Sequence, residues 1–162
     1  MKNPLLVSLD GDPAPGIIIT RFPYEEPRYL NLRIAASNGR LGAELEYYCN
    51  AEDLKQLGKQ FSRFTGARAE QITYELGSEK PEDRFAFFLS LRARPLDSCG
   101  HCAVLFRCNN NQEPPQREVS EFAISADVAD LNRLGQLFTG FSALKHRRLE
   151  WRVTDGSLTE DL

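Results

Sequence analysis

Two twelve-residue segments, DLKQLGKQFSRF (residues 53–64) and DLNRLGQLFTGF (residues 130–141), are identical at six positions when aligned without a gap. In each segment leucine and phenylalanine recur at intervals of three and four residues, which is the spacing of an apolar helix face. Each segment also carries a glycine at its sixth position, Gly58 in the first and Gly135 in the second. The sequence therefore predicts two amphipathic helices that are copies of one another.

The similarity continues in the same register on both sides of the predicted helices. Asn50 and Asp127, both preferred N-cap residues, stand at equivalent positions before the two helices. Apolar residues of the flanking segments correspond as well: Leu45 and Tyr47 to Phe122 and Ile124, and Ile72, Tyr74 and Leu76 to Leu149, Trp151 and Val153. We interpret the pattern as an internal duplication of a strand–strand–helix–strand (ββαβ) unit, with repeat halves at about 28–77 and 102–154.

The two matching glycines need a physical reason, because glycine inside a helix costs about 1 kcal/mol relative to alanine. A residue without a side chain allows another part of the chain to approach the helix closely. We therefore expect Gly58 and Gly135 to let each helix lie close on its sheet.

An alternating pattern before the first helix predicts an antiparallel hairpin. LNLRI (residues 30–34) and RLGAELEYYC (residues 40–49) both alternate, and Asn38-Gly39 between them is a strong hairpin turn signal. The alternation predicts two faces on the second strand: Leu41, Ala43, Leu45, Tyr47 and Cys49 inward, and Gly42, Glu44, Glu46 and Tyr48 outward. We expect the hairpin to be half buried.

The middle of the chain holds two further predicted strands and a polar loop. In residues 84–93 the expected inward face carries Phe85, Phe87, Leu89 and Leu91, and in residues 102–108 it carries Cys102, Val104, Phe106 and Cys108. Residues 109–115 are rich in Asn and Pro, which indicates an exposed connection. Together these features predict one α+β domain over residues 1–162, in which an antiparallel sheet packs with two amphipathic helices.

The composition excludes several classes of protein. The 162 residues are 41% hydrophobic and 27% charged, with a net charge of −3, so nothing in the electrostatics favours binding to nucleic acid. No window approaches the apolar length of a membrane helix, and the N-terminal segment lacks the apolar run of a signal peptide. Four cysteines are too few and too clustered for a disulfide scaffold. We expect a cytoplasmic protein.

The segment DSCGHCAVLF (residues 97–106) contains Cys-Gly-His-Cys, which has three possible interpretations. A thiol–disulfide site needs its first cysteine at a helix N-terminus, whereas Cys99 precedes a predicted strand. A zinc site could use Cys99 and Cys102 with His101 or Cys108, but a structural zinc site usually has a second cysteine pair at similar spacing. The third interpretation is a hairpin turn that leads into a strand, and we favour it.

The search for other catalytic patterns gives nothing specific. The sequence contains no phosphate loop, no GxGxxG and no HExxH motif. Glu44 and Glu46 share a strand face and could form an acid–base pair, but an exposed polar face explains them more simply. We therefore predict no catalytic residues, no metal and no cofactor.

The order of these motifs resembles the WapI-type immunity proteins of bacterial polymorphic toxin systems, and a related uncharacterised bacterial domain family. The resemblance covers roughly residues 28–142 and rests on Gly39-Arg40-Leu41-Gly42-Ala43, on the Gly100-His101 turn and on the acidic cap Asp127. Leu41 stands where the family pattern has Phe, and Val128-Ala129 replace its usual polar pair. The resemblance implies a small protein that blocks a cognate toxin domain, often a nuclease or an ADP-ribosyltransferase, without catalytic residues of its own.

The sequence hypothesis is therefore stoichiometric inhibition of a toxin domain by protein–protein binding, without nucleic acid or membrane. Two alternatives stay open: a thiol- or zinc-dependent enzyme that uses the Cys-Gly-His-Cys segment, and a non-catalytic adaptor domain. Two sets of residues are candidates for binding the toxin, the outward strand face with Glu44, Glu46 and Tyr48, and the loop with Asn109, Asn110 and Asn111. We expect this loop to be free to adapt to a partner.

Overall fold

The computed structural model describes residues 14–160, which form two helices and two antiparallel sheets. The helices are α1 (Ala51–Ser62) and α2 (Val128–Phe141), and a short 3-10 helix, η1, covers Pro81–Asp83. The five-stranded sheet has the order β3-β2-β1-β8-β9, with bounds Gly42–Cys49, Leu30–Ser37, Gly16–Phe22, Arg148–Trp151 and Gly156–Thr159. The four-stranded sheet has the order β4-β5-β6-β7, with bounds Ile72–Gly77, Phe88–Pro95, His101–Asn109 and Val119–Asp127. The predicted α+β class is confirmed.

The duplication is visible in the order of the elements, and each half is one strand longer than predicted. The first half runs β1-β2-β3-α1-β4 and the second runs β5-β6-β7-α2-β8. The last strand of each half pairs with the first strand of the other half, β4 with β5 and β8 with β1. Because of this exchange, each sheet contains strands from both halves, and neither half forms a sheet of its own.

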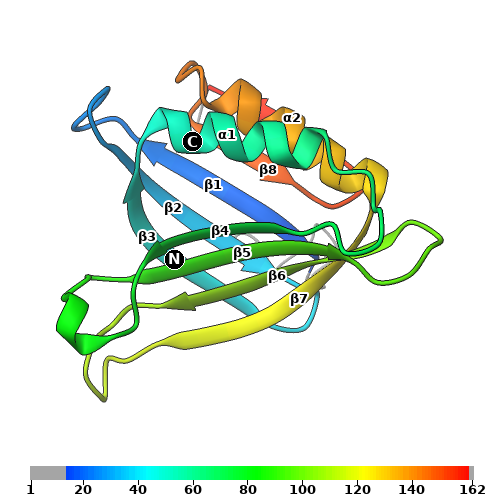
Figure 1. Ribbon diagram of the computed structural model, residues 1–162. Helices are drawn as coiled ribbons and strands as arrows, with labels where there is room; N and C mark the ends of the chain where they lie inside the picture. The colour runs from blue at the N-terminus through cyan, green and yellow to red at the C-terminus, as the bar shows by residue number, and fades with distance from the viewer. Residues whose placement is uncertain (1–13, 161–162) are drawn as a thin grey trace.

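The two helices lie side by side, at the top of the view in Figure 1. A Cβ atom added at Gly135 would lie 2.2 Å from the backbone nitrogen of Ser62 in α1. A Cβ atom added at Gly58 would lie 2.3 Å from the hydroxyl oxygen of Thr139 in α2 and 2.8 Å from its backbone nitrogen. The expectation that these glycines bring each helix close to its sheet is therefore wrong. They bring the two helices close to each other, because each occupies the point where a side chain would meet the opposite helix.

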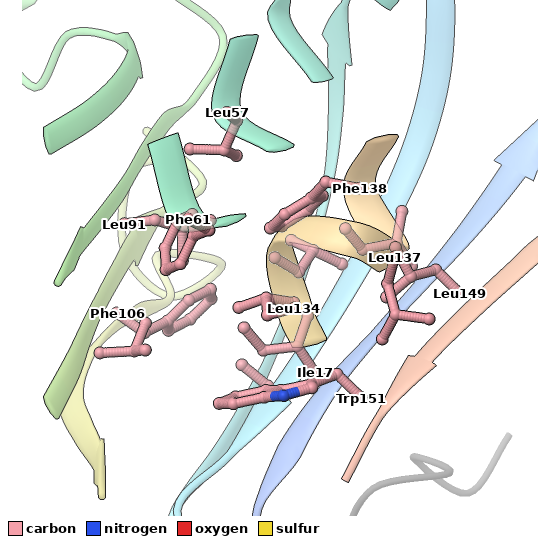
Figure 2. Close-up of a cluster of buried hydrophobic side chains, with 14 of the residues drawn as sticks. Ile17, Leu57, Phe61, Leu91, Phe106, Leu134, Leu137, Phe138, Leu149 and Trp151 are labelled. Atoms are coloured by element: carbon pink, nitrogen blue, oxygen red, sulfur yellow. The ribbon is translucent and has the colours of Figure 1, made fainter. Parts of the chain in front are cut away.

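Equivalent faces of the helices enter one core between the sheets, as Figure 2 shows. Leu57 and Phe61 of α1 and their counterparts Leu134 and Phe138 of α2 are all buried. The rings of Phe61 and Phe138 are 5.9 Å apart between centroids. Trp151 on β8 lies in the same core and donates its indole N–H to the carbonyl of Asp130 at 3.0 Å. The prediction of two equivalent apolar faces is confirmed.

We expect Leu57→Ala and Leu134→Ala each to lower the free energy of unfolding by about 2–5 kcal/mol, because each leaves a cavity in this core. Urea unfolding followed by tryptophan fluorescence measures the change, and Lys59→Ala on the exposed side of α1 is the matched control. Two leucine variants as stable as the control would contradict the shared core.

Both helix starts follow the sequence prediction. Asn50 accepts a hydrogen bond from the backbone N–H of Asp53 at 2.9 Å, and the carboxylate of Asp53 accepts one from the backbone N–H of Asn50 at 3.4 Å. Before α2 the carboxylate of Asp130 accepts the backbone N–H of Asp127 at 2.8 Å. α1 ends at Ser62, with Arg63 as its C-cap residue, and Gly66, with a φ of +77°, lies beyond the helix.

Strand boundaries differ from the predictions at two places. The turn between β2 and β3 is longer than a two-residue Asn-Gly turn, since the side chain of Asn38 accepts the backbone N–H groups of Arg40 and Leu41. Leu41 therefore lies in the turn and is exposed, not inward. β5 begins only at Phe88, which leaves Phe85 exposed before the strand.

Two strands were not predicted. β1 has three consecutive buried isoleucines, Ile17, Ile18 and Ile19, so it shows no alternation. It lies in the middle of the five-stranded sheet, between β2 and β8. β9 has only four residues and forms one edge of the same sheet.

Candidate functional site

The outer face of the five-stranded sheet carries the first predicted set of binding residues. Glu44, Glu46 and Tyr48 alternate with the buried residues of β3 and are all exposed, as predicted, with Tyr48 at 45%. β3 is an edge strand, so its outward side chains stand at the margin of the sheet.

The strand register places further residues beside this set. Arg33 on β2 lies opposite Glu46, and Asn31 lies opposite Tyr48 on one side and Phe22 of β1 on the other. The guanidinium carbon of Arg33 is 5.3 Å from the centre of the Phe22 ring, a cation–π contact. The outer face thus combines carboxylates, an arginine and aromatic rings across three strands.

The loop between β1 and β2 adds two exposed tyrosines. Tyr24 is 80% exposed and stacks on Phe22, with ring centroids 6.3 Å apart and planes 4° from parallel. Tyr29, just before β2, is 55% exposed. We call the whole set the tyrosine face: Phe22, Tyr24, Tyr29, Arg33, Glu44, Glu46 and Tyr48. The sequence analysis missed the first four, because nothing local in the sequence indicates that Tyr24 stacks on Phe22 or that β1 pairs with β2.

A buried arginine fixes the loop that carries Tyr24 and Tyr29. Arg21 is 5% exposed and forms an ion pair with Glu26 of the loop. Its Nε and Nη2 atoms donate to the carbonyls of His146 and Leu144 at 2.9 and 3.0 Å. The loop is therefore tied to the connection between α2 and β8, which is far away in sequence.

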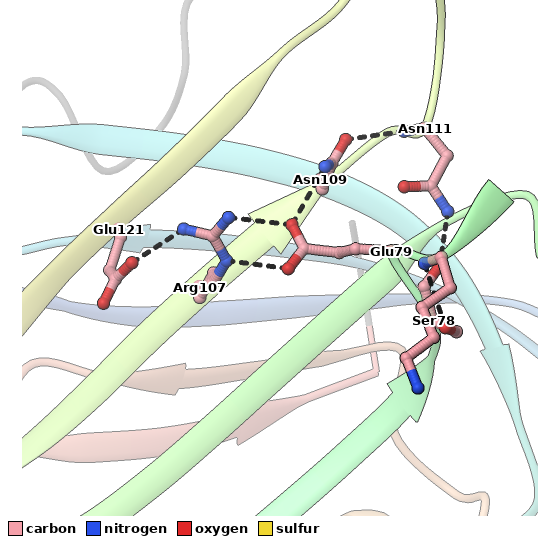
Figure 3. Close-up of polar contacts among 7 residues, drawn as sticks. Ser78, Glu79, Arg107, Asn109, Asn111 and Glu121 are labelled. Atoms are coloured by element: carbon pink, nitrogen blue, oxygen red, sulfur yellow. Dashed lines mark hydrogen bonds and ion pairs between the residues drawn. The ribbon is translucent and has the colours of Figure 1, made fainter.

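The second predicted set, the asparagine loop, is not free to adapt, and that expectation is wrong. Asn109 is 1% exposed at the end of β6, where its amide donates to Glu79 at 2.9 Å. The amide nitrogen of Asn111 donates to the carbonyl of Ser78 at 2.8 Å (Figure 3). It also donates to the carbonyl of Phe85 at 2.9 Å. Asn110 accepts the backbone N–H groups of Gln112 and Glu118. All three side chains therefore hold neighbouring segments in place, although a role of this loop in binding is a prediction that these contacts do not test.

An ion-pair network extends from the asparagine loop across the four-stranded sheet. Arg107 forms ion pairs with Glu79 at 2.9 Å and with Glu121 at 2.7 Å (Figure 3). Hydrogen bonds from Arg107 and Asn109 hold the pKa of the Glu79 carboxyl below its usual range, although partial burial opposes the shift. These partners connect the loop before β5 to β6 and β7, so their role is structural.

The Cys-Gly-His-Cys segment forms a hairpin turn that leads into β6, as we favoured. Asp97 organises the turn: its carboxylate accepts the backbone N–H groups of Cys99 and His101 at 2.8 and 3.2 Å. Gly100 has a φ of +92°, which a residue with a side chain rarely adopts. Cys99 is exposed, whereas Cys102 is buried, and burial raises the pKa of its thiol, which disfavours the reactive thiolate.

His101 and Asp97 form an exposed pair with 2.5 Å between Nδ1 and the carboxylate oxygen. This hydrogen bond, together with the negative charge of Asp97, raises the pKa of His101. A cavity of about 530 Å³ beside the pair is lined by residues that include Asp127 and Asp130. Within residues 14–160, however, no three His, Cys, Asp or Glu side chains are grouped in a way that could hold a metal ion.

We expect Asp97→Asn to lower the pKa of His101, because the variant removes the charge that favours the imidazolium. A ¹H–¹⁵N NMR titration of the imidazole signals measures it directly. Asp127→Asn is the control and should produce a smaller decrease, since Asp127 makes the smallest contribution to the shift. An unchanged pKa in Asp97→Asn would show that the pair does not persist in solution.

Comparisons of the chain with protein-family models, with curated proteins and with solved structures gave no significant match. Neither helix in the described part of the chain is long and apolar enough to cross a membrane. The motif resemblance to WapI-type immunity proteins therefore stays a hypothesis, and the function has to be argued from the surface of the protein.

Proposed function

We propose that this protein is an immunity-type inhibitor that binds a bacterial toxin domain stoichiometrically and uses the tyrosine face as its contact surface. The observation that supports the proposal is that exposed Glu44, Glu46 and Tyr48 share one face of β3, while Phe22 on the same sheet contacts Arg33 and the exposed ring of Tyr24. Tyrosine is enriched among the residues that contribute most to binding at interfaces. The motif resemblance supplies the class of partner.

The rigidity of this face favours protein binding. Glu44, Glu46 and Tyr48 stand on a strand that pairs along its whole length with β2, and β2 pairs with β1. The loop with Tyr24 and Tyr29 is fixed by buried Arg21. A preformed surface loses little conformational entropy when it binds, so more of the contact energy contributes to affinity.

The charge of this face favours a basic partner. Glu44 and Glu46 are exposed, and neither forms an ion pair with another described residue under a 4.0 Å limit. Acidic side chains at the margin of an interface raise the association rate with a basic protein, and salt screens the effect. We therefore propose that Glu44 and Glu46 speed association with the toxin. The tyrosine rings slow its dissociation.

A charge reversal tests the position of the interface. Glu44→Lys combined with Glu46→Lys should slow association with the toxin about tenfold at low salt, with a smaller effect at high salt. Tyr24→Ala should instead speed dissociation. The probe is the toxin domain that this proposal expects to be encoded beside the gene, and surface plasmon resonance at two salt concentrations gives both rates.

The matched control is Glu82→Lys combined with Glu118→Lys, which reverses two exposed charges outside the tyrosine face. The control should protect cells that produce the toxin as well as the parent does. If the variants of the tyrosine face protect equally well and keep the parent rates, this face is not the interface.

The alternative enzyme hypothesis predicts a different outcome. A thiol- or zinc-dependent enzyme would depend on Cys99, His101 and Cys102, which lie in the β5–β6 turn and at the start of β6 and not on the tyrosine face. His101→Ala and Cys99→Ser should leave neutralisation of the toxin unchanged if the protein acts by binding through the tyrosine face. Loss of protection in either variant would favour the enzyme hypothesis.

A further inference from the structure

A second possible binding site lies beside the asparagine loop, at one end of the four-stranded sheet. A cavity of about 360 Å³ opens there between the segment before β5 and the loop before β7, and this volume is within the range of small-molecule sites. The residues that line it include Lys80, Arg84, Phe85, Asn111 and Arg117. Neither the tyrosine face nor the Asp97–His101 pair takes part in it.

Hydrogen bonds between the two segments hold the cavity open in a defined shape. Asn111 donates to the carbonyls of Ser78 and Phe85, so it joins the loop before β7 to the segment before β5 (Figure 3). Ser78 in turn pairs with the carboxylate of Asp83 at 2.5 Å and accepts the backbone N–H of Lys80 at 3.1 Å. The walls are therefore preformed, which lowers the entropic cost of binding a ligand.

The charges that line the cavity are mostly positive, and its three cations lie outside the ion pairs of the described residues. Lys80, Arg84 and Arg117 form no ion pair with any described residue under a 4.0 Å limit. Two carboxylates, Glu79 and Glu113, also line the cavity, so three cations face two carboxylates and the lining keeps an excess of one positive charge. A local excess of positive charge in a chain of net charge −3 favours an anionic ligand.

One wall of the cavity is aromatic. Phe85 is 52% exposed and lies directly before Ala86, which also lines the cavity. Arg84 beside it adopts a left-handed conformation with a φ of 55°, which is uncommon for a residue with a long side chain. Arg84 is the C-cap residue of η1, and a left-handed residue commonly ends a helix.

We propose that this cavity binds a small organic anion whose phosphate or carboxylate group pairs with Arg84 and Arg117 while its apolar part lies against Phe85. Guanidinium groups match both kinds of anion because their N–H donors form paired hydrogen bonds with two oxygens. The site is independent of the tyrosine face, so failure of one proposal leaves the other intact.

Isothermal titration calorimetry at low ionic strength tests the site with three probes: phenyl phosphate, benzoate and inorganic phosphate. We expect saturable binding of phenyl phosphate or benzoate, and whichever binds more tightly identifies the preferred anionic group. Arg84→Gln combined with Arg117→Gln should weaken binding about tenfold or more, since it removes both guanidinium groups. Phe85→Ala should weaken the binding of the two aromatic probes and leave the affinity for inorganic phosphate unchanged.

The matched control is Lys55→Gln combined with Arg63→Gln, which removes two exposed cations on and beside α1. It should bind all probes like the parent. Near-UV circular dichroism shows whether each variant keeps the native fold. Absence of saturable binding in the parent, or equal affinity in the folded Arg84/Arg117 variant and the control, would overturn the proposal.

Discussion

Gly135→Val is expected to destabilise the protein by about 3 kcal/mol, because its side chain would have to displace the opposite helix. The added Cβ atom alone would lie 2.2 Å from the backbone nitrogen of Ser62 and 2.6 Å from its side-chain oxygen. Backbone cannot rotate away as a flexible side chain can, so the two helices must separate. Gly58→Val should have a comparable effect, since its Cβ atom would meet the backbone of Thr139.

Urea unfolding measures these changes, and Gln136→Val is the control. Gln136 is the exposed neighbour of Gly135 in α2, so the control includes the cost of a β-branched residue in the helix without the clash. If Gly135→Val is as stable as Gln136→Val, the close contact between the helices does not exist in solution.

Arg21→Ala is expected to cost about 3–5 kcal/mol, which is the range for removing one partner of a buried ion pair. The variant would leave the carboxylate of Glu26 without its partner and the carbonyls of His146 and Leu144 without their side-chain donors. It should also weaken binding at the tyrosine face, because the loop with Tyr24 and Tyr29 would lose its anchor.

The double variant Arg21→Ala with Glu26→Gln separates the charge from the other contacts. It should recover part of the lost stability, because a neutral amide costs less to bury than an unpaired carboxylate. Arg28→Ala, at an exposed position in the same loop, should leave stability unchanged. An Arg21→Ala variant as stable as Arg28→Ala would show that the buried ion pair does not hold the loop.

Features that depend on neighbouring residues could be predicted from the sequence alone. Asn50 and Asp53 cap α1 because the partner groups are three residues apart, and the alternation of β3 placed Glu44, Glu46 and Tyr48 outward. The gapless match between the two halves gave the order of the elements around each helix. These rules operate within a few residues, so a single sequence carries them.

Long-range packing sets where these elements meet. It paired β4 with β5 and β8 with β1, and it placed each glycine against the opposite helix instead of against a sheet. It also brought Tyr24 beside β1 and joined Arg21 to His146, 125 residues away in the chain. The physical reason is that burial, hydrogen bonding and charge pairing depend on distance in space, and contacts between distant segments leave no periodic pattern in the sequence.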